Sequence, residues 1–192
     1  ISLSIYLRTR YPIFYLAEYA FILAGIFEIF RTITELVLMP FRPISQSLLT
    51  YLSEQNSLKI KKSFLKLIST FLLIASFLSA MFYLIFDIII SYFNLLIDSS
   101  ENVKFYLVSF ILINILNIPF NAFLLSQKKF LYEFLVKSAP AILLVFFLSI
   151  FNVNNNIDEI LLFLSVVTFI EFIIASIFSV KTLKNIQLDE LI

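Results

Sequence analysis

The 192-residue sequence contains no cysteine, no histidine and a single glycine, Gly25. Without cysteine there is no disulfide framework, and without cysteine or histidine there is neither a Cys/His zinc site nor a histidine general base. A loop that cradles phosphate requires several glycines, so this class of nucleotide site is excluded too. We therefore expect no catalytic residue, no metal site and no cofactor, and we interpret the protein as a non-enzyme.

Charge is also scarce, because charged residues make up 14% of the chain, against about 25% in an average soluble domain. The net charge of +1 does not indicate a nucleic-acid partner. Hydrophobic residues account for 61% of the sequence, which is more apolar surface than a water-soluble fold of this length can bury. The composition predicts an all-α, polytopic integral membrane protein whose first partner is the lipid bilayer.

A helix that spans a membrane needs about 20 predominantly apolar residues. Residues 1–11 are expected to be the end of a truncated preceding span, because the chain starts at Ile1 and has no signal-peptide pattern. Short polar turns at residues 53–57, 98–102, 128–129 and 152–158 separate the apolar runs, so we expect one helical bundle over residues 1–192. The pattern predicts five complete spans, at about residues 12–39, 67–96, 103–127, 131–151 and 159–180.

The distribution of basic residues predicts the orientation of the bundle. Ten lysines and arginines flank these spans on one side, and three, Arg8, Arg10 and Lys104, flank them on the other. Cytoplasmic loops carry the excess of basic residues, so the loop at 53–62, the turn at Lys128 and Lys129 and the carboxy-terminal tail are expected in the cytoplasm. The expected location is the plasma (inner) membrane of a bacterium.

Three charged residues interrupt the first apolar run, in the stretch FEIFRTITEL. On a helix, Glu28, Arg31 and Glu35 fall within about 60° of one another, so the arginine can pair with both carboxylates. Such residues at membrane depth normally face a protein interior or a water-filled cavity, whereas near the interface they reach into the headgroups. Pro40 and Pro43 then kink or end the helix. Either an interfacial helix follows, or the bend shapes the mouth of a cavity.

Two further polar features lie inside predicted spans. Asn114, Asn117 and Asn121 repeat at i, i+3 and i+7 around Pro119 and form one stripe. Lipid disfavours this stripe, so it faces either neighbouring helices or a cavity. Glu171 lies near the middle of the last predicted span, where a functional or partner-paired carboxylate is expected.

The runs LAEYAFILAGIFEIFRTITELVLMPFRPISQSLLTYLSEQN and LKIKKSFLKLISTFLLIASFLSAMFYLIFDIIISYF, followed by LLSQKKF, give the chain a resemblance to a known family. In hydropathy, spacing and residue types, residues 8–182 resemble the multidrug/oligosaccharidyl-lipid/polysaccharide exporter superfamily, and its polysaccharide flippases in particular. The resemblance implies a transporter of two six-helix bundles that alternate access to a central cavity. This chain would be most of one bundle, with a second bundle as its partner.

For function, the resemblance implies a flippase that moves a lipid-linked saccharide precursor across the membrane. Such a substrate carries phosphate, so Arg31 is the expected counter-ion, with Glu28 and Glu35 holding it in position. The three asparagines are further candidates for the cavity. The first alternative is a proton- or sodium-coupled exporter of drugs or small organic anions, with Glu28 or Glu171 as the coupling carboxylate. The second is a membrane scaffold without transport.

Overall fold

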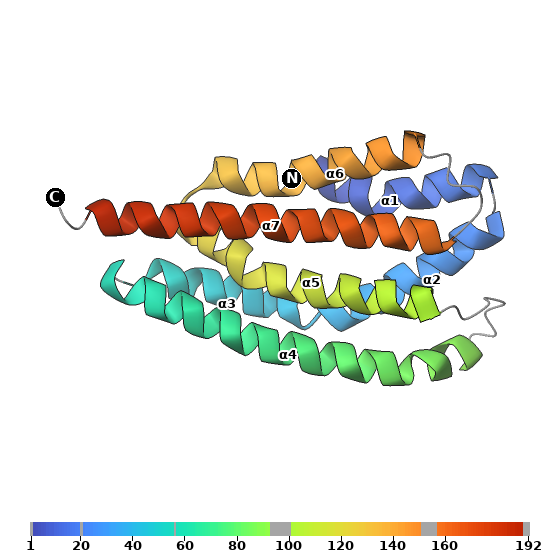
Figure 1. The fold of residues 1–192 in the computed structure, drawn as a ribbon, viewed down its shortest axis with the longest axis horizontal. Coiled ribbons are helices and arrows are strands. Elements are labelled where there is room, and N and C mark those ends of the chain that lie inside the picture. The colour runs from blue at the N-terminus through green and yellow to red at the C-terminus, as the bar shows by residue number, and fades with distance from the viewer. Residues whose placement is uncertain (1, 20, 56, 93–100, 151–156, 190–192) are drawn as a thin grey trace.

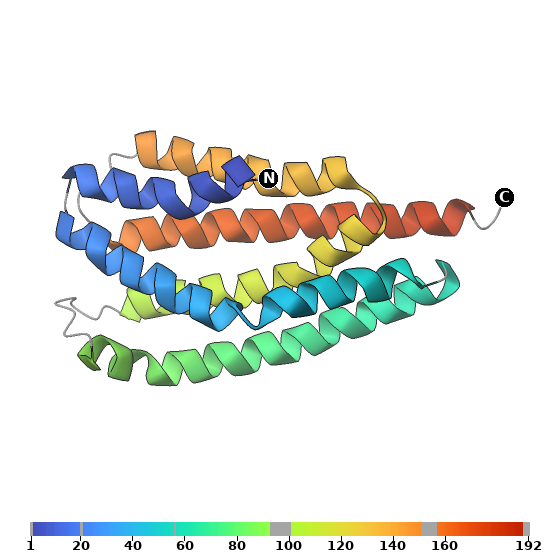
Figure 2. The same ribbon diagram turned by 180° about the vertical axis from the view of Figure 1, so that it is seen from behind.

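The computed structural model of the chain describes residues 2–19, 21–55, 57–92, 101–150 and 157–189, and the regular structure within these ranges is entirely α-helical. The helices lie lengthwise beside one another and alternate in direction, except that α3 follows α2 in the same direction (Figures 1 and 2). The predicted all-α class is confirmed for this part of the chain. The helices are α1 (Ser2–Tyr19), α2 (Phe21–Leu38), α3 (Phe41–Ser53), α4 (Ser57–Tyr92), α5 (Glu101–Ser126), α6 (Phe130–Ile150) and α7 (Ile157–Asp189).

Four of the described helices, α4 to α7, are long and apolar enough to cross a membrane. At 1.5 Å per residue the 26 residues of α5 extend over about 39 Å, which exceeds the roughly 30 Å of hydrocarbon in a bilayer. These four helices correspond to the last four predicted spans and are compatible with an integral membrane protein. Residues 93–96 and 151, predicted as span ends, lie outside the described ranges.

The first predicted span, residues 12–39, is not one continuous helix. Instead, α1 ends at Tyr19, α2 begins at Phe21, and the two helices run antiparallel side by side (Figure 2). Residues 2–11, expected as a separate stub, are continuous with residues 12–19 in α1. Folding back brings Arg10 within 3.7 Å of Glu28, so the hairpin pairs two charges that a straight helix would keep apart.

The chain bends between α2 and α3 because Pro40 and Pro43 have no backbone N–H. The amide of Met39 still donates to the Glu35 carbonyl at 2.8 Å, and the amide of Arg42 donates to the Met39 carbonyl at 3.2 Å. Beyond the bend, α3 continues along the bundle and packs against α5 (Figure 1). The structure thus shows the predicted bend, and the choice between an interfacial helix and the mouth of a cavity stays a prediction.

Phenylalanine side chains do much of the packing between helices. Close approach of membrane helices usually relies on small residues such as glycine, and this chain has only one. The rings of Phe64 on α4 and Phe123 on α5 stack with centroids 4.3 Å apart, and Phe120 on α5 meets Phe172 on α7 edge-on at 5.4 Å. These contacts place α5 between α4 and α7, at the centre of the bundle.

The turn between α5 and α6 is closed by two backbone hydrogen bonds. The amide of Lys129 donates to the Leu124 carbonyl at 3.0 Å, and that of Lys128 donates to the Leu125 carbonyl at 2.9 Å. This is the pattern of a Schellman motif, which requires a left-handed residue after the helix end, usually glycine. Here Lys128 adopts it, with φ of 55°. The turn predicted at Lys128 and Lys129 is thus confirmed.

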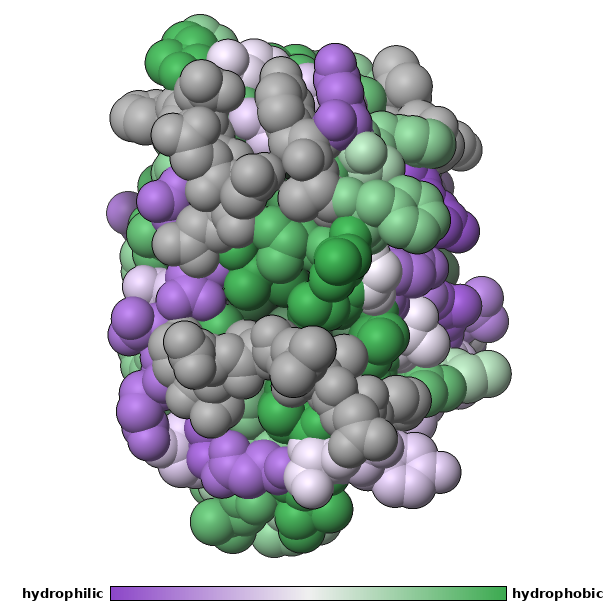
Figure 3. All heavy atoms as spheres, turned by 90° about the vertical axis from the view of Figure 1, so that its right-hand side faces the viewer, coloured by the Kyte–Doolittle hydropathy of each residue, from purple (hydrophilic) through white to green (hydrophobic). Residues whose placement is uncertain are grey.

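The two ends of the bundle differ in charge. The start of α4, the α5–α6 turn and the end of α7 share one end of the bundle (Figure 1). In the sequence these segments carry Lys59, Lys61, Lys62, Lys128, Lys129, Lys181 and Lys184. This agrees with the predicted grouping of these three regions on one side. The opposite end presents apolar residues around its centre and hydrophilic ones toward its edge (Figure 3). There Lys104 on α5 forms an ion pair with Asp87 on α4 at 2.8 Å.

Candidate functional site

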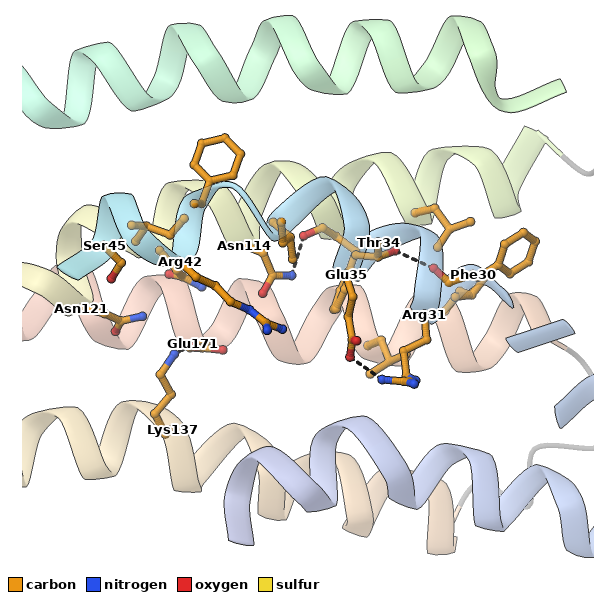
Figure 4. Close-up of a pocket in the computed structure, with 18 of the residues that line it drawn as sticks. Phe30, Arg31, Thr34, Glu35, Arg42, Ser45, Asn114, Asn121, Lys137 and Glu171 are labelled. Carbon is orange, nitrogen blue, oxygen red and sulfur yellow. Dashed lines mark hydrogen bonds and ion pairs between the residues drawn. The ribbon is translucent and has the colours of Figure 1, made fainter. Parts of the chain in front are cut away.

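A partly open cavity of about 680 Å³ is lined by residues of α2, α3, α5, α6 and α7 (Figure 4). Six of the seven site residues predicted from the sequence line it, and Glu28 is the exception. The polar and charged lining residues are Arg31, Thr34, Glu35, Arg42, Ser45, Gln46, Asn114, Asn117, Asn121, Glu133, Lys137 and Glu171.

On the α2 wall, Arg31 is held between two carboxylates, as the helical spacing predicts. Its Nε donates to Glu28 Oε2 at 2.7 Å, a second nitrogen pairs with Glu28 Oε1, and a third pairs with Glu35 Oε1. The Arg31 side chain is only 16% exposed, so most of its surface is covered. Glu28 lies beside the cavity, where it also pairs with Arg10 of α1. The guanidinium of Arg31 is therefore compensated before any ligand enters.

Arg42, in the first turn of α3, lines the same cavity and was not among the predicted site residues. It ion-pairs with no acidic side chain in the part of the chain that the structure describes. Its side chain extends from α3 into the space in front of α7 (Figure 4). The sequence signal was available, because Arg42 stands between the two prolines that bend the chain. In the sequence, Arg42 counts as one of the ten basic residues that predict the orientation of the bundle.

The asparagine stripe on α5 faces the cavity rather than only its neighbouring helices. Asn114 donates from Nδ2 to the Phe110 carbonyl at 2.7 Å. Asn117 is 3% exposed, and neither its Oδ1 nor its Nδ2 has a hydrogen-bond partner among the described residues. The Oδ1 of Asn121 is likewise buried without a partner there. The stripe thus borders the cavity and also packs among neighbouring side chains, so the choice between its two alternatives stays a prediction.

Glu171, predicted as a functional or partner-paired carboxylate, is paired with Lys137 of α6, whose Nζ lies 2.6 Å from Glu171 Oε1 (Figure 4). Glu133, one helical turn before Lys137 and 6% exposed, lines the cavity beside them. Sequence reasoning missed both α6 residues, although ionisable residues inside a predicted span are the expected signal of a functional site.

The cavity thus combines aromatic walls, three cationic side chains, three acidic side chains and a row of amides. Its volume falls in the roughly 300–1,000 Å³ range typical of small-molecule sites. The described residues contain no group of three or more acidic side chains placed to hold a metal ion. This mixture suits an amphiphilic ligand with a polar group. No family model, curated protein or solved structure matches the chain, so the interpretation of the cavity depends on the residues that line it.

Proposed function

We propose that the chain is a membrane transporter of the polysaccharide-exporter type, which moves a lipid-linked saccharide precursor across the bilayer by alternating access. The observation that carries this proposal is the polar cavity inside a bundle of apolar helices. Charged and amide side chains at that depth are costly unless they line a path or a binding site. The resemblance of residues 8–182 to polysaccharide flippases favours the same function.

In this proposal α2 and α3 together make a fifth crossing, and α1 is the partial sixth element of the bundle. Alone, α2 has 18 residues and about 27 Å of length, but α3 extends it in the same direction along the bundle. The lysine-bearing end lies in the cytoplasm, with the carboxy-terminal tail, by the positive-inside rule. The membrane is the inner membrane of a bacterium, and a second bundle completes the transporter.

The phosphate of the substrate would bind first at Arg42. Arg31 is occupied by Glu28 and Glu35, so a phosphate must displace a carboxylate to reach it. Arg42 faces the cavity with no described acidic partner and offers the same bidentate geometry, which lysine lacks. Arg31, the counter-ion expected from the sequence, then serves as a second contact. When the cavity changes shape during transport, Arg31 releases Glu35 and pairs with the phosphate instead.

The test is transport in reconstituted vesicles by the chain assembled with its second bundle. The substrate is a saccharide phosphate that is linked to a lipid and carries a fluorescent label, which a membrane-impermeant reductant quenches. We expect the wild type to equilibrate the label between leaflets. We expect Arg42→Ala to slow this at least about tenfold and Arg42→Lys to be intermediate, since a charge-assisted hydrogen bond contributes about 1.5–3 kcal/mol.

The matched control is Lys61→Ala, which removes an exposed cation from the start of α4, away from the cavity lining. It is expected to leave transport unchanged. Equal slowing by Lys61→Ala and Arg42→Ala would mean that general charge, rather than the cavity, controls the rate. A wild type that moves no label would favour the scaffold alternative.

The ion-coupled exporter is kept as a second candidate because of the Lys137–Glu171 pair. A carboxylate that is 1% exposed inside an apolar helix is a suitable coupling group when a cation can displace its partner. This candidate predicts that a proton or sodium gradient drives transport in the wild type and no longer drives it in Glu171→Gln. A rate independent of both gradients would exclude it.

A further inference from the structure

Three lysines near the start of α4 share one face of that helix. At 100° per residue, Lys59, Lys62 and Lys66 fall within about 60° of one another. All three are exposed, and none forms an ion pair with an acidic side chain in the part of the chain that the structure describes. The one acidic residue of α4 itself, Asp87, lies near the other end of the helix. The face therefore carries positive charge that no described carboxylate compensates.

This lysine face points away from the rest of the protein. The opposite side of α4 carries the rings of Phe64, Phe71 and Phe82, which are buried against the bundle. Helix α4 also forms one edge of the bundle, as the two opposite views show (Figures 1 and 2). The three lysines are thus open to whatever surrounds the protein, and not to a neighbouring helix of the chain.

Farther along α4 the same face becomes apolar. Leu73, Phe77 and Leu84 continue the row of lysines, and their side chains are 73%, 65% and 74% exposed. Large exposed apolar side chains on a helix long enough to cross a bilayer are suited to contact with acyl chains. One strip of surface therefore passes from cationic to apolar along the helix axis, and the boundary lies between Lys66 and Leu73.

The two parts of this strip have the dimensions of one bilayer leaflet. From Lys59 to Lys66 the helix rises about 10 Å, and Leu73 lies about 10 Å farther along. The headgroup region of a bilayer is roughly 5–7 Å thick on each side of about 30 Å of hydrocarbon. Because lysine side chains extend their ammonium groups toward water, all three can reach the headgroup layer while Leu73 stays among acyl chains.

The strip suits a molecule that has a net negative charge at one end and an apolar chain at the other. A phospholipid with an anionic headgroup meets both requirements with a single molecule. Phosphatidylcholine also carries a phosphate, but its own choline cation compensates that charge, so the lysines gain less from it. A neighbouring protein would need both carboxylates beside the lysines and an apolar surface beside Leu73 and Phe77.

We propose that Lys59, Lys62 and Lys66, together with Leu73, form a binding site for an anionic phospholipid on the outer face of α4. The lysines hold the headgroup, and the acyl chains lie along the apolar part of the strip. This inference goes beyond the proposed function, because it does not depend on what the cavity carries.

The test uses quenching of tryptophan fluorescence by brominated lipids. The chain has no tryptophan, so Leu73→Trp places a single reporter beside the proposed site. The full chain is reconstituted into phosphatidylcholine bilayers that contain a minor share of dibrominated phosphatidylglycerol or of dibrominated phosphatidylcholine. We expect phosphatidylglycerol to bind about fivefold more tightly, which corresponds to about 1 kcal/mol, and raised salt to reduce this ratio.

Two variants and a second reporter serve as controls. In the Leu73→Trp background, replacing Lys59, Lys62 and Lys66 together by glutamine should bring the ratio close to one. Lys61→Gln removes an exposed lysine that lies off the strip on the same helix, so it should leave the ratio unchanged. Leu84→Trp lies on the same face toward the other end of α4, far from the lysines, and should report no preference.

Equal quenching of Leu73→Trp by the two lipids would overturn the proposed site. A preference for phosphatidylglycerol that survives the triple glutamine replacement would overturn it as well. Quenching by neither lipid would show that protein, such as a second bundle, covers this face in place of lipid, and this too would contradict the proposal.

Discussion

Lys137 of α6 and Glu171 of α7 are joined by a hydrogen-bonded ion pair, with 2.6 Å between Lys137 Nζ and Glu171 Oε1. The Glu171 side chain is 1% exposed and that of Lys137 24%, so the carboxylate depends on the ammonium more than the reverse. The two residues are 34 positions apart in the sequence. The pair thus links the two helices in the region where both face the cavity.

Replacing one partner of this pair is expected to lower the free energy of unfolding more than replacing both. Lys137→Met removes the cation that pairs with the buried Glu171 carboxylate and should lower the free energy of unfolding by about 3 kcal/mol. The double variant with Glu171→Leu should recover part of this loss, because the Glu171 charge is removed together with its partner while Glu133 stays in place. Unfolding by sodium dodecyl sulfate titration from mild micelles measures both values. A double variant as unstable as Lys137→Met would show that packing, not charge, explains the loss.

Two neighbouring asparagines should respond in opposite ways to the same substitution. Asn117→Leu removes an amide with no described partner and should raise the free energy of unfolding by about 1–3 kcal/mol. Asn114→Leu removes a donor to the Phe110 carbonyl and should lower it by about 0.5–1.5 kcal/mol. The same detergent titration gives both numbers. Destabilisation by Asn117→Leu would mean that bound water already satisfies the amide.

Replacing Lys128 by glycine should stabilise the α5–α6 turn. Lys128 occupies a left-handed conformation, which costs a residue with a Cβ roughly 1–2 kcal/mol and costs glycine little. We expect Lys128→Gly to raise the free energy of unfolding by about 1 kcal/mol. Lys129→Gly is the control, because Lys128 is the described non-glycine residue with positive φ. An equal effect of the two substitutions would contradict this account of the turn.

The helix directions predict which positions share a side of the membrane. The chain has no cysteine, so single cysteines need no background removal. Cysteines placed at Lys62, Lys128 and Lys184 should react with an impermeant maleimide from one side, and those at Asn102 and Glu159 from the other. Intact and opened membrane vesicles distinguish the two sides. Labelling of Lys62 and Asn102 variants from the same side would rule out α4 as a crossing.

The parts of the fold that sequence could predict are those set by local periodicity. The Glu28–Arg31–Glu35 face follows from 3.6 residues per turn, and the four apolar helices follow from the length of their runs. The hairpin formed by α1 and α2 cannot be predicted from periodicity, because both helices are apolar and no proline or glycine stands between Tyr19 and Phe21. It depends on the packing of α1 against α2 and α6, which includes the ion pair of Arg10 with Glu28.

The site residues that were predicted follow from periodicity within one helix, and those that were missed depend on contacts between helices. The asparagine stripe is a property of one helix, so its spacing reveals it. The role of Arg42 depends on the direction of α3 after the Pro40 bend, and that of Lys137 on the packing of α6 against α7. Neither can be derived from a periodicity. The unused amide of Asn117 is visible only once every neighbouring donor and acceptor is placed.

Helix α1 contributes no residue to the cavity lining, yet it packs against both α2 and α6, which do. Two described polar contacts hold it there: Arg10 with Glu28 of α2 at 3.7 Å, and the hydroxyls of Tyr11 and Ser149 of α6 at 3.3 Å. It therefore covers one side of the bundle next to the cavity without lining it. Under the proposed function, the lipid-linked substrate would keep its acyl tail in the lipid while its head occupies the cavity, and this requires α1 to separate from one of these two neighbours. The ion pair of Glu28 with Arg10 would then be one of the contacts that break when α1 leaves α2.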